Sequence, residues 1–470
     1  MAFLVVGPAA LGLALVPVVR EPRQQELPSL VVDDISQLNP ITVDSVLVPT
    51  TVDEIATAVA RNDGPIAIGG GRHSMGGQIA TDGAFFIDMR RFDKVLEVDR
   101  QARTVRVQAG ATWRQIQEAI DPLDLSIKIM QSYSNFTVGG SLSVNAHGRY
   151  VGSGPLITAV RSIKVVLADG SVVEASPTIN RDIFYGTIGG YGGIGVIIEA
   201  TLDLAGNTRV KRETGLMPIA RYARYFRDGI QGQSAPMFHN ANIFAPDFTD
   251  VRVVTYNRTD EPVSITERLR PADASYRLNR LAYWVQSEMP LGSSIEQYVL
   301  DPMYFAGSPV SWRNYEASYD VAELEPASRG SSTYLLQEYF VPQDRFDEFV
   351  PHMRMILRAH QVNVMDISIR YALQDPGSLL AWARQDVFAF VIYYKLDTNS
   401  GALADELAWT RELTDAALSV NGSFYLPYRL NATVEQFARA YPRAGEFVAL
   451  KRRVDPTGKF RNRLIERYLQ

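Results

Sequence analysis

Three glycine-rich loops are the segments of this sequence best suited to binding a charged ligand. They span residues 69–77, 137–148 and 189–195, and each adjoins a predicted strand. Glycine lets backbone N–H groups approach a phosphate without an intervening Cβ, and consecutive amides form an anion-binding nest. None of the loops matches the P-loop pattern, and none reads Gly-x-Gly-x-x-Gly between a strand and a helix. Three such loops in one domain favour a large phosphate-bearing cofactor over three separate tight turns.

Residues for acid–base chemistry are scarce outside these loops. The chain of 470 residues has five histidines and no cysteine, and only His73 and His147 lie in glycine-rich segments. The absence of cysteine excludes disulfides, thiolate nucleophiles, cysteine-held iron–sulfur clusters and cysteine-containing zinc sites.

A second candidate site lies on a predicted strand, residues 362–371. Asp366, Ser368 and Arg370 are spaced two apart, so their side chains share one face of that strand. An acid, a hydroxyl and a guanidinium on one face suit proton removal and charge stabilisation. The alternative for Arg370 is a surface pairing with a solvated carboxylate.

An α+β fold must position these residues. Up to about residue 207, short strands and helices alternate with tight turns, without the long βαβ rhythm of a nucleotide-binding Rossmann domain. Thr112 and Gln115 form a capping box for a helix that ends near residue 120. Residues 162–174 form a hairpin around the Asp169-Gly170 turn.

The middle of the chain has a different pattern of predicted strands and helices. Strands are predicted at the three ranges 334–341, 362–371 and 387–396. The helices between and after them cover residues 344–360, with a bend at Pro351, and 402–418. This alternation predicts an antiparallel sheet with helices on one face.

The N-terminus is apolar. Residues 2–19 carry no charge, a length that suits a signal sequence or a membrane anchor, and a polar linker follows to residue 39. Pro8 and Pro17 weaken a straight helix there, and a mis-assigned start or a buried strand is the alternative. The sequence thus favours a cell-envelope or membrane-associated protein anchored by this segment, with a cytoplasmic location as the alternative.

The net charge argues against a nucleic-acid partner. Lys and Arg number 47 against 52 for Asp and Glu, so the formal net charge is −5. Because no basic run stands out either, the electrostatic footprint of a nucleic-acid-binding protein is missing.

The glycine loops and the end of the chain carry a family resemblance. The run Gly69-Gly70-Gly71-Arg72-His73-Ser74, the segment 137–140 and the loop 189–195 resemble the FAD-binding domain of the vanillyl-alcohol oxidase/PCMH flavoprotein superfamily. Residues 449–460 resemble that superfamily's closing segment. The resemblance implies four parts: the N-terminal anchor or signal and linker (1–39), a PCMH-type FAD-binding domain (40–207), a substrate or cap domain (208–421), and a segment returning to the FAD domain (422–470).

The resemblance also implies which residues hold FAD. His73 occupies the position of a histidine that sugar-alcohol oxidases and cytokinin dehydrogenases bond to the flavin 8α-methyl group. The alternative is a histidine that packs on a non-covalent flavin, as in decaprenylphosphoryl-ribose oxidases. The implied FAD-binding residues come from all three loops: Gly69, Gly70, Gly71, Arg72, His73, Ser74, Met75, Gly76, Gln78, Thr137, Val138, Gly139, Gly140, Ser141, Asn145, Gly148, Gly190, Gly195, Val196 and Ile197.

The catalytic expectations follow from the chemistry of hydride transfer to flavin N5. The substrate hydroxyl must lose a proton, and charge on the flavin must be stabilised. Asp366 and Arg370 are the candidates, although polyol oxidases carry Glu-x-Arg where this chain has Ser368-Ile369-Arg370. The resemblance places His147 beside the isoalloxazine ring, either as a proton-handling group or as a hydrogen-bonded loop histidine. Tyr428 is expected in another wall of the site.

The predicted activity is therefore FAD-dependent oxidation of a CH–OH group in a polyol, sugar or aldonolactone. A C–N-oxidising enzyme and a non-catalytic flavin- or sugar-binding protein of the envelope are the alternatives. The expected partners are a small-molecule substrate and either oxygen or a membrane quinone as the electron acceptor.

Overall fold

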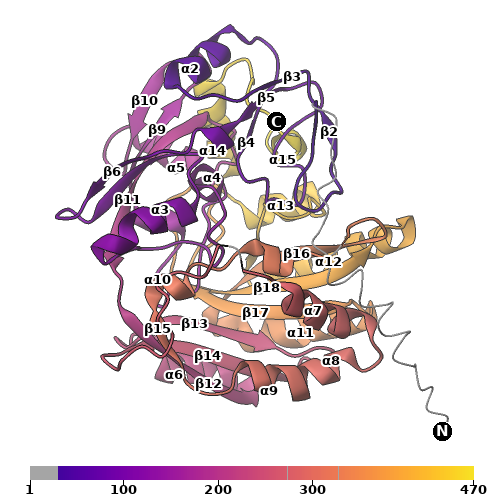
Figure 1. Ribbon diagram of the computed structural model, residues 1–470. Helices are drawn as coiled ribbons and strands as arrows, with labels where there is room; N and C mark the ends of the chain where they lie inside the picture. Colours follow the sequence, from indigo (N-terminus) through magenta and orange to yellow (C-terminus); the bar gives the residue numbers. More distant parts are fainter. Residues whose placement is uncertain (1–29, 273, 327) are drawn as a thin grey trace.

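Two groups of sheets divide the fold in the computed structural model, which describes residues 30–272, 274–326 and 328–470 (Figure 1). Residues 31–206 form the smaller sheets, and one large antiparallel sheet follows. The predicted α+β class is confirmed. No described helix has both the length and the apolar character needed to cross a bilayer. Residues 1–29, which include the predicted anchor, lie outside the described part of the chain.

The N-terminal unit contains a parallel three-stranded sheet and a larger antiparallel one. The parallel sheet has the order β3 (Ser45–Leu47), β5 (Phe85–Asp88), β4 (Ile66–Gly69). The antiparallel sheet has the order β10 (Val172–Ala175), β9 (Val160–Val166), β11 (Val196–Gly206), β7 (Thr104–Gln108), β6 (Val95–Asp99), with β8 (Leu125–Ile127) also paired to β11. The helices of this unit are α2 (Val52–Arg61), α3 (Trp113–Ile120), α4 (Val138–Ser143) and α5 (Arg181–Thr187).

Local signals in this unit formed as predicted. Thr112 and Gln115 make both hydrogen bonds of the capping box at the start of α3. Strands β9 and β10 pair as an antiparallel hairpin.

The residues just before position 40 are folded, in contrast to the predicted linker. Val31–Val32 (β1) pairs with Ile41–Thr42 (β2). Between these strands, the buried Asp34 accepts hydrogen bonds from Asn39 Nδ2 at 2.8 Å and from the backbone N–H of Gly77 at 2.9 Å. This stretch therefore braces the first glycine loop.

The cap is one eight-stranded antiparallel sheet. Its order is β15 (Val310–Trp312), β12 (Arg209–Pro218), β14 (Asp250–Arg258), β13 (Pro236–Ile243), β17 (Val364–Ala372), β18 (Val387–Asp397), β16 (Ser332–Pro342), β19 (Ser423–Phe424). Helices α6 (Tyr222–Gly229), α11 (Phe346–Ala359) and α12 (Ser400–Ser419) accompany these strands. Pro351 lies inside α11, which continues through it.

Helices cover both faces of this sheet, not one. On one face, Phe346 of α11 packs on Phe390 of β18, with the ring centroids 5.5 Å apart. On the other face, Tyr283 of α7 (Arg277–Glu288) packs on Tyr393, with the ring centroids 5.4 Å apart. α7 continues into α8 (Gly292–Ile295), a π-helical turn (Glu296–Leu300) and α9 (Asp301–Tyr304). The sequence analysis did not predict this helical excursion.

The end of the chain packs on the N-terminal unit. Figure 1 shows α14 (Ala444–Val454) and α15 (Arg463–Tyr468) beside the early strands, with α13 (Val434–Ala440) next to them. The N–H of Ile66 donates to the Lys459 carbonyl at 2.7 Å. The ammonium of Lys451, which is buried, donates to the Gly193 carbonyl at 2.9 Å and to Asp455 Oδ2 at 2.6 Å. The closing segment therefore fastens the third glycine loop.

Replacing Lys451 by methionine should lower the stability by about 3 kcal/mol, because it leaves the fully buried Asp455 carboxylate without its cation. The midpoint of urea denaturation measures this loss. Lys128→Met is the matched control, since Lys128 is exposed and pairs with Asp203 at 3.0 Å, so it should cost less than about 1 kcal/mol. Equal losses of stability in the two variants would contradict the view that the buried Lys451–Asp455 pair stabilises the fold more than an exposed pair does.

Candidate active site

One cavity lies between the glycine loops and the cap sheet. Its loop side includes Gly70, Gly71, Arg72, His73, Ser74, Met75, Gln78, Thr137, Gly139, Gly140, Ser141, Gly195 and Ile197. Its other side includes Glu338, Asp366, Ser368, Arg370 and Tyr393 from the cap, together with His147, Tyr425 and Tyr428. The structure thus brings the four predicted catalytic residues, His147, Asp366, Arg370 and Tyr428, to one cavity.

Seven predicted FAD-binding residues do not line this cavity. Tight packing explains why two of these positions are glycine. A Cβ on Gly69 would lie 2.3 Å from the Phe86 ring, and one on Gly190 would lie 2.1 Å from the Gly186 carbonyl oxygen. Asn145 has a positive φ of 47° and donates a hydrogen bond to Asp375 at 2.7 Å. The residues behind the wall are Gly69, Gly76, Val138, Asn145, Gly148, Gly190 and Val196, of which the two valines are fully buried.

The first two glycine loops are held together by one hydroxyl. The N–H of Gly71 donates to Thr137 Oγ1 at 3.3 Å, and a Cβ on Gly70 would lie only 2.4 Å from that oxygen. Only glycine therefore allows the two loops to come this close. The result is a cradle of exposed backbone, which fits a pyrophosphate group.

The tail closes the same cradle from the other side. The N–H of Met75 donates to the Pro427 carbonyl at 2.7 Å, and Gln78 Nε2 donates to the carbonyls of Leu426 and Tyr428 at 2.6 and 2.7 Å. These bonds fix Tyr428 against the first loop. Loop and tail therefore form a single wall.

His73 has the environment of a neutral imidazole. Its ring packs on Phe136 with the centroids 4.3 Å apart, and burial lowers its pKa to about 4. Its Nδ1 atom is buried and has no hydrogen-bond partner among the described residues. An unprotonated nitrogen on the cavity wall fits contact with a flavin.

The cap sheet presents a polar face to the cavity. A β-bulge precedes Asp366, and from there Asp366, Ser368 and Arg370 alternate regularly, so all three side chains reach the cavity as their spacing predicted. Asn242 of the neighbouring strand β13 donates to Asp366 at 2.8 Å, and burial raises the pKa of Asp366 to about 6. The Nε atom of Arg370 is buried without a hydrogen-bond partner among the described residues, so this guanidinium retains binding capacity.

Glu338 is the site residue that the sequence analysis missed. Glu338 on β16 and Ser368 on β17 are both register partners of Val391 on β18, so they share the polar face. The Glu338 side chain is 2 % exposed, and its Oε1 lies 2.5 Å from His147 Nε2. The available signal was that Glu338 is the one charged residue of β16, because a carboxylate is rarely buried without a partner.

His147 and Glu338 form a hydrogen-bonded pair. His147 Nδ1 contacts the Gly148 carbonyl at 3.1 Å, an acceptor that requires the N–H on that atom. His147 Nε2 and Glu338 Oε1 would otherwise be two acceptors facing each other, so a proton must lie between them. Tyr428 donates to Glu338 Oε2 at 3.4 Å, which completes the group.

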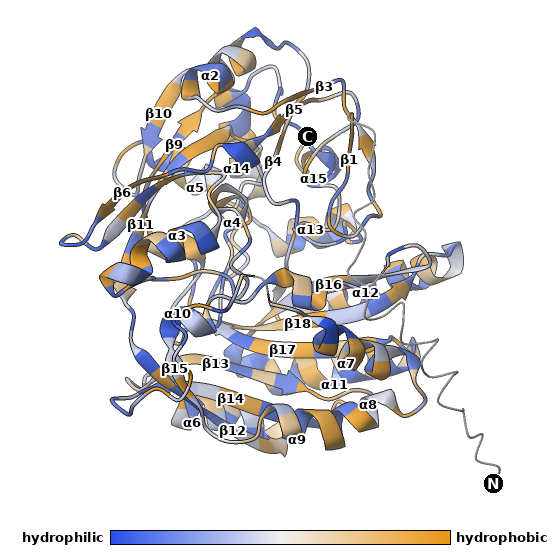
Figure 2. Cartoon of the chain, in the orientation of Figure 1, coloured by the Kyte–Doolittle hydropathy of each residue, from blue (hydrophilic) through white to orange (hydrophobic). Residues whose placement is uncertain are grey.

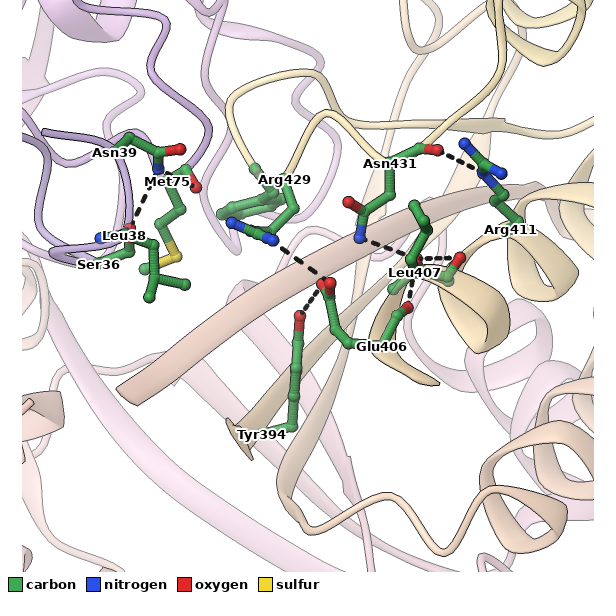
Figure 3. Close-up of polar contacts among 12 residues, drawn as sticks. Ser36, Leu38, Asn39, Met75, Tyr394, Glu406, Leu407, Arg411, Arg429 and Asn431 are labelled. Carbon is green, nitrogen blue, oxygen red and sulfur yellow. Dashed lines mark hydrogen bonds and ion pairs between the residues drawn. The ribbon is translucent and has the colours of Figure 1, made fainter. Parts of the chain in front are cut away.

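The residue after Tyr428 is fastened to the cap. Arg429 Nε lies 3.6 Å from the carboxylate of Glu406, which is fully buried on α12 and accepts from Tyr394 at 2.9 Å (Figure 3). Figure 3 also shows Met75 on the opposite side of Arg429. The Tyr428 segment is thus held on both sides.

Comparison with known proteins agrees with this geometry. Residues 43–176 match the model of an FAD binding domain, and residues 244–468 match that of D-arabinono-1,4-lactone oxidase. The chain is 22% identical to L-gulonolactone oxidase of Mus musculus over 89% of its own length and 93% of that protein. It is 25% identical to alditol oxidase of a Streptomyces species, covering 89% and 94%. It is also 25% identical to decaprenylphosphoryl-beta-D-ribose oxidase of Mycolicibacterium smegmatis, covering 91% and 95%.

The fold, the glycine cradle and these matches define an FAD-linked oxidoreductase acting on CH–OH donors. The prediction of an enzyme with FAD as its cofactor is confirmed, and the alternative of a non-catalytic binding protein is set aside. The predicted resemblance to the vanillyl-alcohol oxidase/PCMH-type superfamily of FAD-binding oxidoreductases is confirmed.

Proposed function

We propose that this protein oxidises a hydroxyl-bearing carbon of a sugar, polyol or aldonolactone, with the substrate bound between the glycine loops and the polar face of β16 and β17. The observation that carries this proposal is the group of Glu338, Ser368 and Arg370, which combines a proton acceptor, a hydroxyl and a cation on one face. These are the groups that bind an oxygen-rich substrate. The relatives named for L-gulonolactone and alditol support this substrate class.

FAD held by the glycine loops supplies the hydride acceptor. The chain's own residues must then remove the hydroxyl proton, and we assign this step to Glu338. The Oε1 atom of Glu338 is hydrogen-bonded to His147, and its Oε2 atom faces the Tyr428 hydroxyl. Because Glu338 directly contacts a residue of the second glycine loop, we favour it over Asp366 as the base.

Arg370 is proposed to orient the substrate oxygens and to stabilise negative charge that develops during the reaction. Its guanidinium keeps its charge at any working pH and offers a planar set of donors. Asp366 is proposed to hold a second substrate hydroxyl through a carboxyl group that titrates near pH 6.

A substrate screen tests the proposed function. Stopped-flow mixing of the holoenzyme with polyols, aldonolactones and amines, without oxygen, should bleach the flavin with a hydroxyl donor and leave it oxidised with amines. Bleaching by amines alone would favour the C–N-oxidising alternative. Measuring hydrogen peroxide after readmitting oxygen, against reduction of a quinone, identifies the electron acceptor.

His73 is proposed to bond the flavin covalently: the new C–N bond would replace one C–H bond of the 8α-methyl group, and the two electrons released would pass through the flavin to the enzyme's electron acceptor. Its buried Nδ1 lacks a partner and its pKa is near 4, so the imidazole is an uncharged nucleophile at neutral pH. Acid precipitation should leave the yellow colour in the protein pellet, and His73→Ala should move that colour into the supernatant. The proposal is wrong if free FAD is released from the unmutated protein.

A further inference from the structure

An exposed apolar surface covers the helical excursion of the cap. Among the described residues, fifteen large apolar side chains are exposed, and seven of these lie between residues 278 and 304. The most exposed are Leu278, Leu291, Met303 and Tyr298, at 79, 78, 72 and 71 %. Figure 2 shows apolar stretches along α8 and α9 at the outer edge of the cap. Such a concentration marks an interaction site, since single exposed apolar residues are ordinarily scattered.

Two charged residues of this excursion, Arg280 and Asp301, are buried, whereas Arg277 and Glu288 are exposed. Asp301 is buried and accepts from Arg252 Nε at 3.0 Å, and Glu288 is paired with Lys395. Arg280 is also buried. The seven exposed large apolar side chains therefore outnumber the two exposed charged residues, Arg277 and Glu288, on this excursion.

The shape of the surface indicates what kind of partner fits. Side chains exposed by more than 70 % project from the backbone and do not line a groove. Projecting Leu, Met and Tyr side chains suit a soft, planar, apolar phase into which each can insert, as amphipathic membrane-surface helices do. Tyrosine is also a residue that favours the boundary between lipid and water.

The apolar N-terminal segment can reach the same plane. The Ser36 carbonyl accepts from Thr333 Oγ1 at 2.9 Å, at the start of β16. The next residue of β16, Tyr334, pairs with Lys395, which in turn pairs with Glu288 at the end of α7. Ser36 therefore lies beside the start of β16, the described chain begins at Leu30, and residues 20–29 have an extended length of up to about 35 Å.

We propose that residues 278–304 dock on a lipid bilayer, alongside insertion of the uncharged segment 2–19 into the same bilayer. A single apolar anchor gives weak and reversible attachment, whereas two together give stable binding. Tyr283 of the same excursion lines the cavity, so docking would hold the cap side of the active site at the membrane surface.

The test is binding of the full chain to phosphatidylcholine vesicles, measured by flotation. The variant Leu291→Asp/Tyr298→Asp/Met303→Asp should bind at least about tenfold more weakly, because three inserted apolar side chains become charged. The matched control is Val172→Asp/Ile179→Asp/Met355→Asp, which changes three apolar side chains that are exposed elsewhere. The control should float like the unmutated protein, and flavin reduction in vesicle-free solution should be the same for all three proteins.

Three outcomes would overturn the proposal. Equal flotation of both triple variants would show that the surface does not touch lipid. A dimer of the unmutated chain that the first variant separates, without vesicle binding, would identify a second copy as the partner. The last outcome is that the full chain does not bind vesicles and that deletion of residues 2–19 causes aggregation through residues 278–304. That result would show that residues 2–19 cover the apolar surface.

Discussion

Replacing Glu338 by glutamine should slow flavin reduction by substrate by about 100- to 10,000-fold, the range expected for losing a general base. The amide keeps the size of the side chain and a hydrogen bond to His147, but it does not accept the substrate's hydroxyl proton. Anaerobic stopped-flow spectroscopy measures the rate, and the flavin absorbance of the purified protein checks that FAD is retained.

Asp366→Asn is the matched control for this prediction. It makes the same change in a second buried carboxyl group of the cavity, which already accepts from Asn242, and it should cost about tenfold or less. A large loss in Asp366→Asn together with a small loss in Glu338→Gln would reverse the assignment of the base. A pH profile separates a chemical role from a structural one, because only loss of the base should remove the ionisation that limits reduction at low pH.

Arg370→Ala should slow flavin reduction by roughly 100-fold or more, the scale of removing one preorganised electrostatic stabiliser. The guanidinium has a buried Nε without a hydrogen-bond partner among the described residues, so its removal breaks no hydrogen bond at that atom, although Asp366 loses a nearby positive charge. The FAD content and the melting temperature should therefore stay close to those of the unmutated protein.

Arg370→Lys should rescue part of this loss, because lysine restores the charge without the planar arrangement of donors. The same stopped-flow measurement applies to both variants. Reduction of Arg370→Ala at the unmutated rate would show that the guanidinium does not act on the substrate or the flavin.

Much of the site could be predicted because its signals are local. The spacing of Asp366, Ser368 and Arg370 places them on one face of a strand, and no distant contact changes that period. The glycine loops were recognised for the same reason. Individual glycines were harder: Gly70 faces the cavity, whereas Gly69 makes room for Phe86, and only the packing distinguishes them.

Glu338 could not be assigned because its role depends on a partner 191 residues away. Two features place His147 against Glu338: β16 pairs with β18, and the second glycine loop packs on β16. The excursion from α7 to α9 was missed because its apolar residues point both to the cap and to the surface, which obscures helical periodicity.

The contacts of the closing segment have a consequence for biosynthesis. Met75 and Gln78 bond to residues 426–428, and the third glycine loop is fastened by Lys451. The ribosome makes these partners 348 to 350 residues after Gln78 or in the last few dozen positions of the chain. Although N-terminal domains usually fold first during synthesis, this cofactor cradle is incomplete until translation is nearly finished. We therefore infer that flavin is acquired after the chain leaves the ribosome, so that a prematurely terminated chain would carry no cofactor and perform no redox chemistry.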